Sequence, residues 1–516
     1  MIVLGASEGS LPSYGTISGI LTDQEREALR VMGVPLTGGA MDGLQTEFSE
    51  IYGVFCGARS SVYISCSTEQ PSFLYRRLLK ISGNELTPAP VLECLCGSPK
   101  ESAAYLVRRG CNELSDALGL SEYFKKYTDA IQYTLGKVTA ETVRALYGHS
   151  LMLSASQVDL QADCRLAYFL KYGLHAKERK PATVDPAEYG TYVHAVLEHT
   201  VKTVMQQGGF HNITLEQTLQ IAHSYSDEYL NSHFGELDSV RLTYLFQRNC
   251  LELEMVVVEL WEELKESEFV PSYFELAFGN GRDVNAIAIV GKKMKAQLRG
   301  FVDRVDVWQG NFGNFFRVVD YKTGKKDFDY CNVFNGLGLQ MLLYLFALEQ
   351  AGSDLVGDRC IAAGVQYFPA RAPYLPAEGR LSDAEARVTR EKVWKRSGLL
   401  LHDEAVLRAM EPGEHFVHLC CTRKKDGTLS GDLANPDQMK MLRSYIFHLL
   451  GNMVDEIASG TVTPNPYTRG SSHNACTFCP YGCVCHSESV EGRRNYKMMS
   501  AQEFWSEVEK EVNRYG

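Results

Sequence analysis

Short runs of apolar, β-branched and aromatic residues recur in the middle of the chain. They cover residues 273–278, 286–290, 297–308 and 315–321, and runs of this length and composition predict β-strands. A longer apolar stretch from Gly338 to Glu349 predicts a helix, and residues 363–368 predict a further strand. Strands followed by helices in this order predict an α/β fold, with a sheet flanked by helices.

Polar residues mark where several helices begin. Ser382 with Glu385, and Ser500 with Glu503, have the spacing of capping boxes, so we expect amphipathic helices to start there. A new unit begins near Leu153, where Ser154 or Ser156 can cap the helix that leads to Cys164.

The first 70 residues alternate between strand and helix signals. Residues 1–5 and 61–65 are short apolar runs, and residues 22–30 have a charged helix start. The first strand begins at residue 1, so its sheet neighbours have to come from elsewhere and we expect this α/β domain to be incomplete. Residues 100–150 continue as helix without a catalytic signal.

Composition narrows the class of protein. The 516 residues carry 52 Lys and Arg against 63 Asp and Glu, a net charge of −11, with 45% hydrophobic residues. These values are typical of a globular protein with two main domains and exclude a disordered or collagen-like chain. The sequence has no apolar run long enough to span a membrane and no secretory signal, which predicts a cytoplasmic protein. The charge argues against a basic surface overall but allows a channel lined locally by Lys and Arg.

The candidate catalytic residues lie in and after the strands predicted between 297 and 321. Asp320 and Lys322 are two apart and therefore face the same side of a strand, whereas Asp303 and Asp306 are three apart and face opposite sides. Only one of that pair can join a common site. Two carboxylates and an ammonium, supplied by Asp303, Asp320 and Lys322, suit a divalent cation and hydrolysis at phosphorus. The alternative is that Asp320 and Lys322 end a strand and pair in solvent.

These motifs resemble a known family. The segments GFVDRVD (300–306), VVDYKTG (318–324) and GLQMLLY (338–344) look like the PD-(D/E)XK nuclease superfamily, in the RecB-like branch that includes the AddB family of ATP-dependent helicase/deoxyribonucleases. Residues 188–194 are similar to the Gly-Thr-x-x-His motif of its first nuclease helix. The resemblance implies a RecB-like nuclease domain with a mixed sheet flanked by helices.

The same resemblance implies roles for individual residues. Mg²⁺ would be held by Asp303, Asp320, His194 and the Tyr321 carbonyl, and Lys322 would assist the attacking water. Gln340 and Tyr344 would orient the active site or the DNA. The residues themselves leave alternatives: His194 lies beside an apolar helix face, and Gln340 with Tyr344 can be the polar edge of a core helix.

The chain has 15 cysteines, and with no export signal they do not indicate a disulfide framework. Four of them fall between Cys476 and Cys485, which is metal-ligand spacing. In AddB-like proteins a [4Fe-4S] cluster is held by one cysteine before the nuclease core and three after it. By that resemblance the ligands are Cys164, Cys476, Cys479 and Cys485, and they would clasp the two ends of the domain. Cys483 is an alternative to Cys485, and the spacing alone suits zinc as well as iron.

The N-terminal part resembles the last portion of the helicase-like region of AddB. Gly57 stands where active helicases of this type place an arginine, and the chain has no phosphate-binding loop, so we expect no ATP hydrolysis by this chain alone. The expected boundaries are a partial helicase-like α/β domain at 1–95, a helical connector at 96–150, the nuclease domain at 151–490 and a C-terminal helix at 491–516.

The resemblance implies a Mg²⁺-dependent deoxyribonuclease, an exonuclease, that acts as the AddB-like component of a helicase-nuclease complex. Its partners would be DNA and an AddA-like protein. Its role would be the processing of double-strand breaks for recombinational repair. The chain would lack the N-terminal half that members of the family carry. Two alternatives remain: a non-catalytic DNA-binding or scaffold protein with a structural iron-sulfur cluster, and a stand-alone RecB-like nuclease.

Overall fold

A computed structural model describes most of the chain and divides it into two compact units, Met1–Tyr133 and Thr134–Gly516. The described residues are 1–13, 21–36, 39–66, 70–85, 98–110, 112–132, 136–177, 186–234, 240–279, 281–357, 359–372, 382–470, 473–485 and 492–515. Each unit is described by itself. None of the helices within these ranges is both long enough and apolar enough to cross a bilayer.

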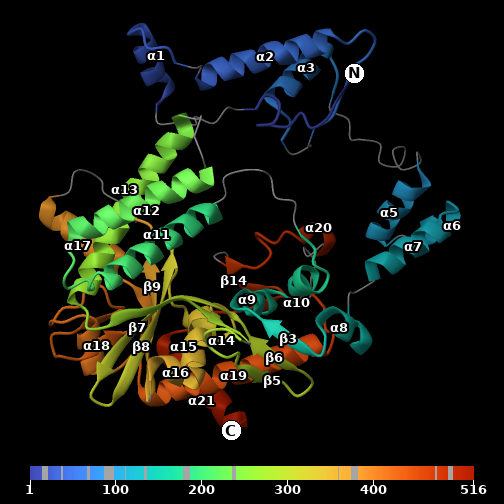
Figure 1. Cartoon of the computed structure of the whole chain (residues 1–516). Helices are drawn as coiled ribbons and strands as arrows, with labels where there is room; N and C mark the ends of the chain where they lie inside the picture. Colours follow the sequence, from blue (N-terminus) through green and yellow to red (C-terminus); the bar gives the residue numbers. More distant parts are fainter. Residues whose placement is uncertain are drawn as a thin grey trace. The chain divides into compact units, whose positions relative to one another are not determined.

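The first unit contains a two-stranded parallel sheet and helices, which Figure 1 shows in blue to teal. Strand β1 (Ile2–Val3) pairs with β2 (Tyr63–Ile64), which confirms both strands predicted there. Thr22 caps the first helix through a capping box with Glu25, as its helix signal predicts. The helices of this unit are α1 (Asp23–Val31), α2 (Ala40–Cys56), α3 (Phe73–Ser82), α5 (Pro99–Arg109), α6 (Asn112–Ala117) and α7 (Ser121–Gln132).

The second unit is built on a mixed six-stranded sheet, which confirms the predicted fold class. The strand order is β13-β10-β9-β8-β7-β4; β8 with β9 and β10 with β13 are parallel, and the other pairs are antiparallel. The strands are β4 (Val270–Phe278), β7 (Gly300–Gly310), β8 (Gly313–Lys322), β9 (Cys360–Pro369), β10 (Ser397–Leu401) and β13 (Leu433–Ala434).

One predicted strand is wrong. Residues 297–308 are not continuous: β6 (Lys295–Leu298) belongs to a separate three-stranded sheet with β3 (Ser150–Leu153) and β5 (Ala288–Val290), and β7 begins only at Gly300. Between them the Arg299 amide donates to the Leu153 carbonyl, 2.8 Å away. The pattern of apolar residues continues from β6 into β7 although the two strands belong to different sheets. Burial against either sheet produces the same alternation of apolar and polar residues.

Helices cover both faces of the six-stranded sheet. On one face lie α11 (Pro186–Gln206), α12 (Leu215–Phe234) and α13 (Val240–Glu266), whose apolar residues pack against Val319 and Tyr321 of β8. Figure 1 shows these three helices stacked together. The other face packs against α15 (Gln340–Ala351) and α19 (Pro436–Ala458). Helix α15 is the one predicted from residue 338.

The predicted helix starts are confirmed. Ser154, rather than Ser156, caps α9 (Ala155–Asp163) and forms a capping box with Gln157. Ser382 caps α17 (Asp383–Trp394) in the same way, and Ser500 bonds Glu503 at the start of α21 (Ala501–Tyr515). The remaining elements are α8 (Ala140–Tyr147), α10 (Arg165–Tyr168), the π-helix η1 (Phe169–Gly173), α14 (Tyr330–Phe334), α16 (Ser353–Val356), α18 (Glu404–Met410), β11 (Cys421–Arg423), β12 (Leu429–Gly431), β14 (Tyr467–Arg469), β15 (His473–Asn474), α20 (Gly482–Cys485) and β16 (Arg494–Asn495).

Candidate active site

Three carboxylates lie side by side across neighbouring strands. The pairing of Arg304 with Val319 sets the register of β7 and β8, and one step further places Asp303 beside Asp320. On the other side, the β4–β7 register places Glu275 of β4 opposite Asp303. Asp303 is therefore the central member of the row, with one acidic neighbour on each side.

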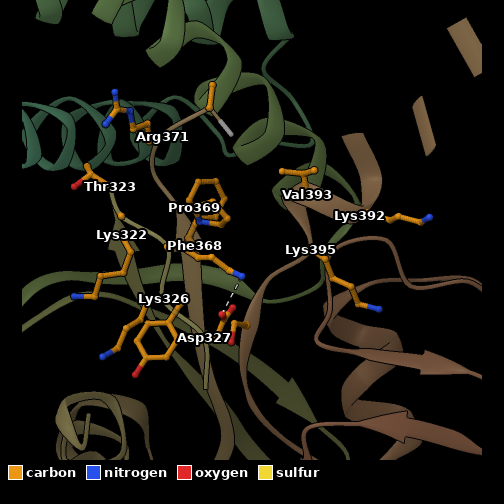
Figure 2. A pocket seen from close by; sticks show the side chains of 15 residues that line it. Lys322, Thr323, Lys326, Asp327, Phe368, Pro369, Arg371, Lys392, Val393 and Lys395 are labelled. Carbon is orange, nitrogen blue, oxygen red and sulfur yellow. Dashed lines mark ion pairs between the residues drawn. The ribbon is translucent and has the colours of Figure 1, made fainter. Parts of the chain in front are cut away.

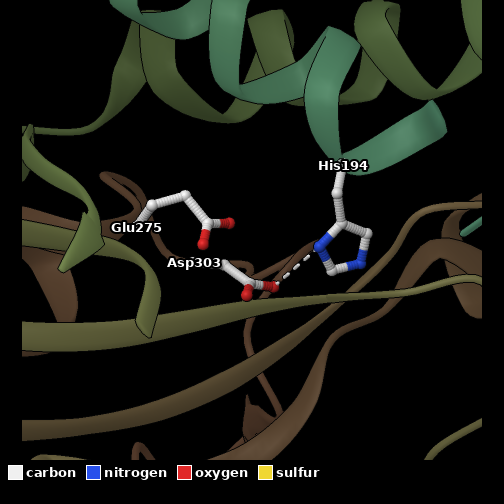
Figure 3. A group of neighbouring side chains, drawn as sticks. All are labelled: His194, Glu275 and Asp303. Carbon is white, nitrogen blue, oxygen red and sulfur yellow. Dashed lines mark ion pairs between the residues drawn. The ribbon is translucent and has the colours of Figure 1, made fainter. Parts of the chain in front are cut away.

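His194 reaches this row from α11. Its Nδ1 lies 3.3 Å from Asp303 Oδ2, and its Nε2 lies 2.8 Å from the Tyr321 carbonyl oxygen. Figure 3 shows the ring pointing from the helix toward Asp303, with Glu275 on the far side. His194 is next to the apolar residues Val193 and Val196, which are fully buried, but its own ring faces the carboxylates. The helix therefore has the expected apolar face at Val193 and Val196, and His194 beside it contacts the carboxylates.

Asp320 and Lys322 form a close ion pair, with Asp320 Oδ2 2.6 Å from Lys322 Nζ. Asp320 is only 3% exposed, so the alternative of a pair in open solvent is wrong. Burial, and then the negative charge of Asp303, raise the pKa of Asp320 to about 6, against the attraction of the Lys322 ammonium. Desolvation is the leading cause, as expected for a buried carboxyl.

Glu275 is the member of the site that motif reasoning missed. A ligand atom of Glu275 lies within 4.8 Å of ligand atoms of both His194 and Asp303. Its backbone φ is +48°, a left-handed conformation that a side chain other than glycine rarely adopts. Burial, followed by the charge of Asp303, raises its pKa above the usual value. The sequence signal was only an acidic residue inside a predicted strand.

Tyr344 supports the site from α15. Its ring stacks on Phe278 with centroids 5.4 Å apart, and its hydroxyl accepts a hydrogen bond from the Phe301 amide. A Cβ at position 300 would collide with this hydroxyl, so the motif glycine Gly300 is what allows α15 to approach β7. Gln340 is half-buried at the first position of the same helix, one turn away.

Asp306 faces away from the site, as the strand spacing predicts. Arg304 binds it through two nitrogens at 2.8 and 3.1 Å, and Arg317 Nε donates to it at 2.9 Å. The side chains of all three are fully buried. Arg304 also donates to the Tyr321 hydroxyl at 2.9 Å, so this ion network fixes the side chain of the residue whose carbonyl contacts His194.

The ion network continues through Glu263 of α13. Arg317 donates to it at 2.9 Å and Arg396 at 2.9 and 3.0 Å. Burial pushes the pKa of Glu263 upward, but the guanidiniums of Arg396 and Arg317 outweigh it and lower the pKa below its usual range. These ion pairs lie between α13 and the sheet, and they connect α13 to β7, β8 and the residue before β10.

The donor set fits a hard divalent cation. Carboxylate oxygens, a carbonyl and an imidazole are ligands that Mg²⁺ or Mn²⁺ accepts. The buried Asp320 Oδ2 contacts the Lys322 ammonium at 2.6 Å, and a bound divalent cation would share this carboxylate with the ammonium. If Nε2 of His194 donates to Tyr321, its Nδ1 presents a lone pair to Asp303, and a cation or proton is needed between them.

The cysteines expected to form a clasp lie in one region of the second unit. Cys164 and Cys485 both pack against an apolar cluster of Leu166, Phe169, Leu170 and Val462. Burial, and then repulsion from the thiolate forms of Cys164 and Cys476, raise the pKa of Cys479. Cys483 is exposed, whereas the four expected ligands are partly buried. Among the described residues these sulfurs do not form a group of three within 4.8 Å.

Hydrogen bonds hold the two cysteine segments together. The Arg165 amide donates to Asn465 Oδ1 at 2.8 Å, and the Tyr481 hydroxyl donates to the Ala176 carbonyl at 3.0 Å. Arg494 donates to the carbonyls of Ala162 and Asp163. Residues about 300 positions apart are thus brought together at this point.

Comparison with known proteins identifies similar chains. A family model described as "PD-(D/E)XK nuclease superfamily" matches residues 152–486. Proteins named as the B subunit of ATP-dependent helicase/deoxyribonuclease are similar over nearly the full chain: 26% identity in Clostridium perfringens, over 99% of this chain and 48% of that protein, and 28% in Acetivibrio thermocellus, over 98% and 48%. The Clostridium tetani protein is 29% identical over 95% of this chain and 46% of its own length. The chain spans about half the length of these curated relatives.

Proposed function

Because the chain belongs to the PD-(D/E)XK nuclease superfamily, we propose that it is a metal-dependent deoxyribonuclease component of a helicase-nuclease that processes double-strand DNA ends for recombinational repair. The observation that carries the proposal is the row of Glu275, Asp303 and Asp320 beside His194 and Lys322. Buried carboxylates next to an ammonium are costly to a fold and suit a site that handles a phosphodiester.

Each side chain has a task in this proposal. Asp303, Asp320, His194 and the Tyr321 carbonyl would hold Mg²⁺, which polarises the scissile phosphate and lowers the pKa of the attacking water. Asp320 keeps the Lys322 ammonium close to the cation ligands. Lys322 positions the water and stabilises negative charge that develops on the phosphate oxygens. Tyr344 maintains the approach of α15 to the strand that carries Asp303, and Gln340 would orient the active site or the DNA.

The names of the relatives support the wider assignment. Each is named as one component of a helicase/deoxyribonuclease, and we propose that this chain likewise works with an AddA-like helicase-nuclease partner and acts on DNA ends as an exonuclease. The chain alone should not hydrolyse ATP, since it has Gly57 at the arginine position and lacks a phosphate-binding loop.

We also propose that Cys164, Cys476, Cys479 and Cys485 hold a [4Fe-4S] cluster. The apolar cluster shared by Cys164 and Cys485 supports this assignment, because it brings the upstream cysteine into the region of the C-terminal ones. Thiolate ligation would couple metal binding to the joining of two distant segments.

The test compares Asp303→Asn and Lys322→Ala with Asp437→Asn, a control whose side chain is 89% exposed on α19. We expect the wild type and the control to degrade linear DNA with Mg²⁺, and both site variants to lose at least about 100-fold in rate, the usual scale for a positioned catalytic group. Calorimetric titration with Mn²⁺ provides a second measurement, in which Asp303→Asn should bind more weakly. Full cleavage by both site variants would rule this site out, and absence of Mg²⁺-dependent cleavage by the wild type would favour a non-catalytic DNA-binding role.

A further inference from the structure

A cavity of about 740 Å³ opens next to Lys322. Its walls come from the segment after β8, the end of β9 and the end of α17. Figure 2 shows Lys322 and Lys326 on one side, Lys392 and Lys395 on the other, and Phe368 with Pro369 between them. We call this cavity the lysine cleft; the basic residues that line it are Lys322, Lys325, Lys326, Arg371, Lys392 and Lys395.

The positive charge of the lysine cleft is only partly compensated. One acidic residue, Asp327, lies among the described lining residues, and Lys325 pairs with it at 3.2 Å. Arg371 pairs with Glu252 at 3.3 Å, and Lys322 pairs with Asp320 at 2.6 Å. For Lys392 and Lys395, no described carboxylate lies within ion-pair distance. In a chain of net charge −11, this concentration of cations marks a local site for an anionic ligand.

We propose that the lysine cleft holds the sugar-phosphate backbone of a single DNA strand, on one side of the phosphodiester that is cut. The proposal rests on the nuclease function proposed above and adds the path of the strand. Lys322 carries the connection, because it contacts Asp320 in the active site and also lines the cleft. A strand in the cleft therefore runs from the scissile phosphate toward Lys395.

The size and lining of the cleft select the ligand. Its volume falls in the usual range of pockets for small ligands, about 300 to 1,000 Å³, which is enough for a few nucleotides of one strand. The aromatic lining residues Tyr367 and Phe368 are 5% and 1% exposed and offer no surface on which bases can stack. The cleft therefore offers contacts between ammonium groups and phosphates, and such contacts do not discriminate between base sequences.

The test measures binding of an end-labelled oligodeoxythymidine by fluorescence anisotropy over a range of KCl concentrations. The full chain carries Asp320→Asn so that the probe stays intact. The cleft variant is Lys392→Gln with Lys395→Gln. The control is Lys424→Gln with Lys425→Gln, two exposed lysines in the turn between β11 and β12 that remove the same charge. A third variant, Lys392→Arg with Lys395→Arg, keeps the charge.

Loss of two phosphate contacts to a single strand should lower the slope of log affinity against log salt by about 1.4, and affinity about tenfold near ~0.15 M salt. The control and the arginine variant should bind like the parent. The arginine variant also controls for a structural effect of Lys392. This residue lies in the last turn of α17, where a positive charge stabilises the helix, and arginine keeps that charge.

Unchanged affinity and slope in the cleft variant, or an equal loss in the control, would overturn the proposal. Displacement of the probe by polyglutamate as effectively as by unlabelled oligodeoxythymidine would assign the cleft to acidic peptides and overturn it as well. Failure of the nuclease function appears separately, as absence of Mg²⁺-dependent cleavage by the chain without Asp320→Asn. Failure of this proposal alone leaves that cleavage intact and the binding insensitive to the two lysines.

Discussion

Replacing Asp320 by asparagine should abolish cleavage and at the same time stabilise the metal-free fold. The carboxyl is 3% exposed and lies beside Asp303, and its pKa rises from 3.8 to about 6. An acid whose pKa is raised on folding binds its proton more tightly in the folded state than in the unfolded state. Ionising it therefore costs stability, and asparagine removes that cost while keeping the shape.

The magnitude follows from the pKa difference of roughly two units. At about 1.4 kcal/mol per unit, the ionised Asp320 lowers the free energy of unfolding by up to about 3 kcal/mol. A buried amide that lacks a full set of hydrogen-bond partners costs about 1 to 3 kcal/mol, so the expected net gain for the variant is at most about 2 kcal/mol.

The sign of the pH dependence is fixed by the direction of the shift. Between pH 3.8 and about 6 the folded state binds more protons at this site than the unfolded state, so wild-type stability falls as pH rises through that window. The advantage of Asp320→Asn should therefore be complete above about pH 7 and absent near about pH 4. Urea unfolding in a chelator, at both pH values, measures it, with Asp437→Asn as the exposed control.

Adding Mg²⁺ should then reverse the order. A ligand that binds only the folded wild type stabilises it by about 2.7 kcal/mol at 100 times its dissociation constant, whereas the variant lacks one cation ligand. An advantage of the same size at both pH values, or a variant less stable than wild type at high pH without metal, would refute the claim that burial of Asp320 is what raises its pKa.

Three further outcomes can be measured. Gly300→Ala should cost about 1 to 3 kcal/mol by overpacking and slow cleavage, because the new Cβ meets the Tyr344 hydroxyl; addition of Tyr344→Phe should recover part of the thermal stability, and no recovery would contradict that contact. Asp306→Ala should cost about 3 to 5 kcal/mol in urea unfolding, since it leaves buried arginines unpaired; wild-type stability would show the network to be dispensable. Cys164→Ser should bleach a brown, iron-containing protein purified without oxygen, whereas Cys483→Ser should not; a colourless protein with zinc would keep the clasp and reject the iron.

The sequence by itself determined the features that depend on neighbouring positions. Capping boxes need only a serine and a glutamate three residues apart, and those at Ser382 and Ser500 form as expected. The two-residue period of a strand placed Asp320 and Lys322 on one side and separated Asp303 from Asp306. The motifs around these residues also indicated the family.

Tertiary structure alone decided which strands are neighbours. Glu275 joins the site because β4 pairs with β7 in a register that brings it opposite Asp303, and no local pattern contains that pairing. For the same reason the apolar run across Arg299 concealed a change from one sheet to another. Strand periodicity fixes the side of a sheet but not the partner, since partner choice depends on burial of the whole unit.

Burial was likewise decided by the fold. Asp320 and Asp306 are both aspartates that follow a valine in a strand, yet Asp320 pairs with the partly exposed Lys322 while Asp306 is enclosed by two buried arginines. Lys392 and Lys395 enter the lysine cleft because α17 ends beside β9, far from the catalytic motif in sequence. A charge pattern in the sequence allows such a cleft, but only the packing of distant segments collects the charges in one place.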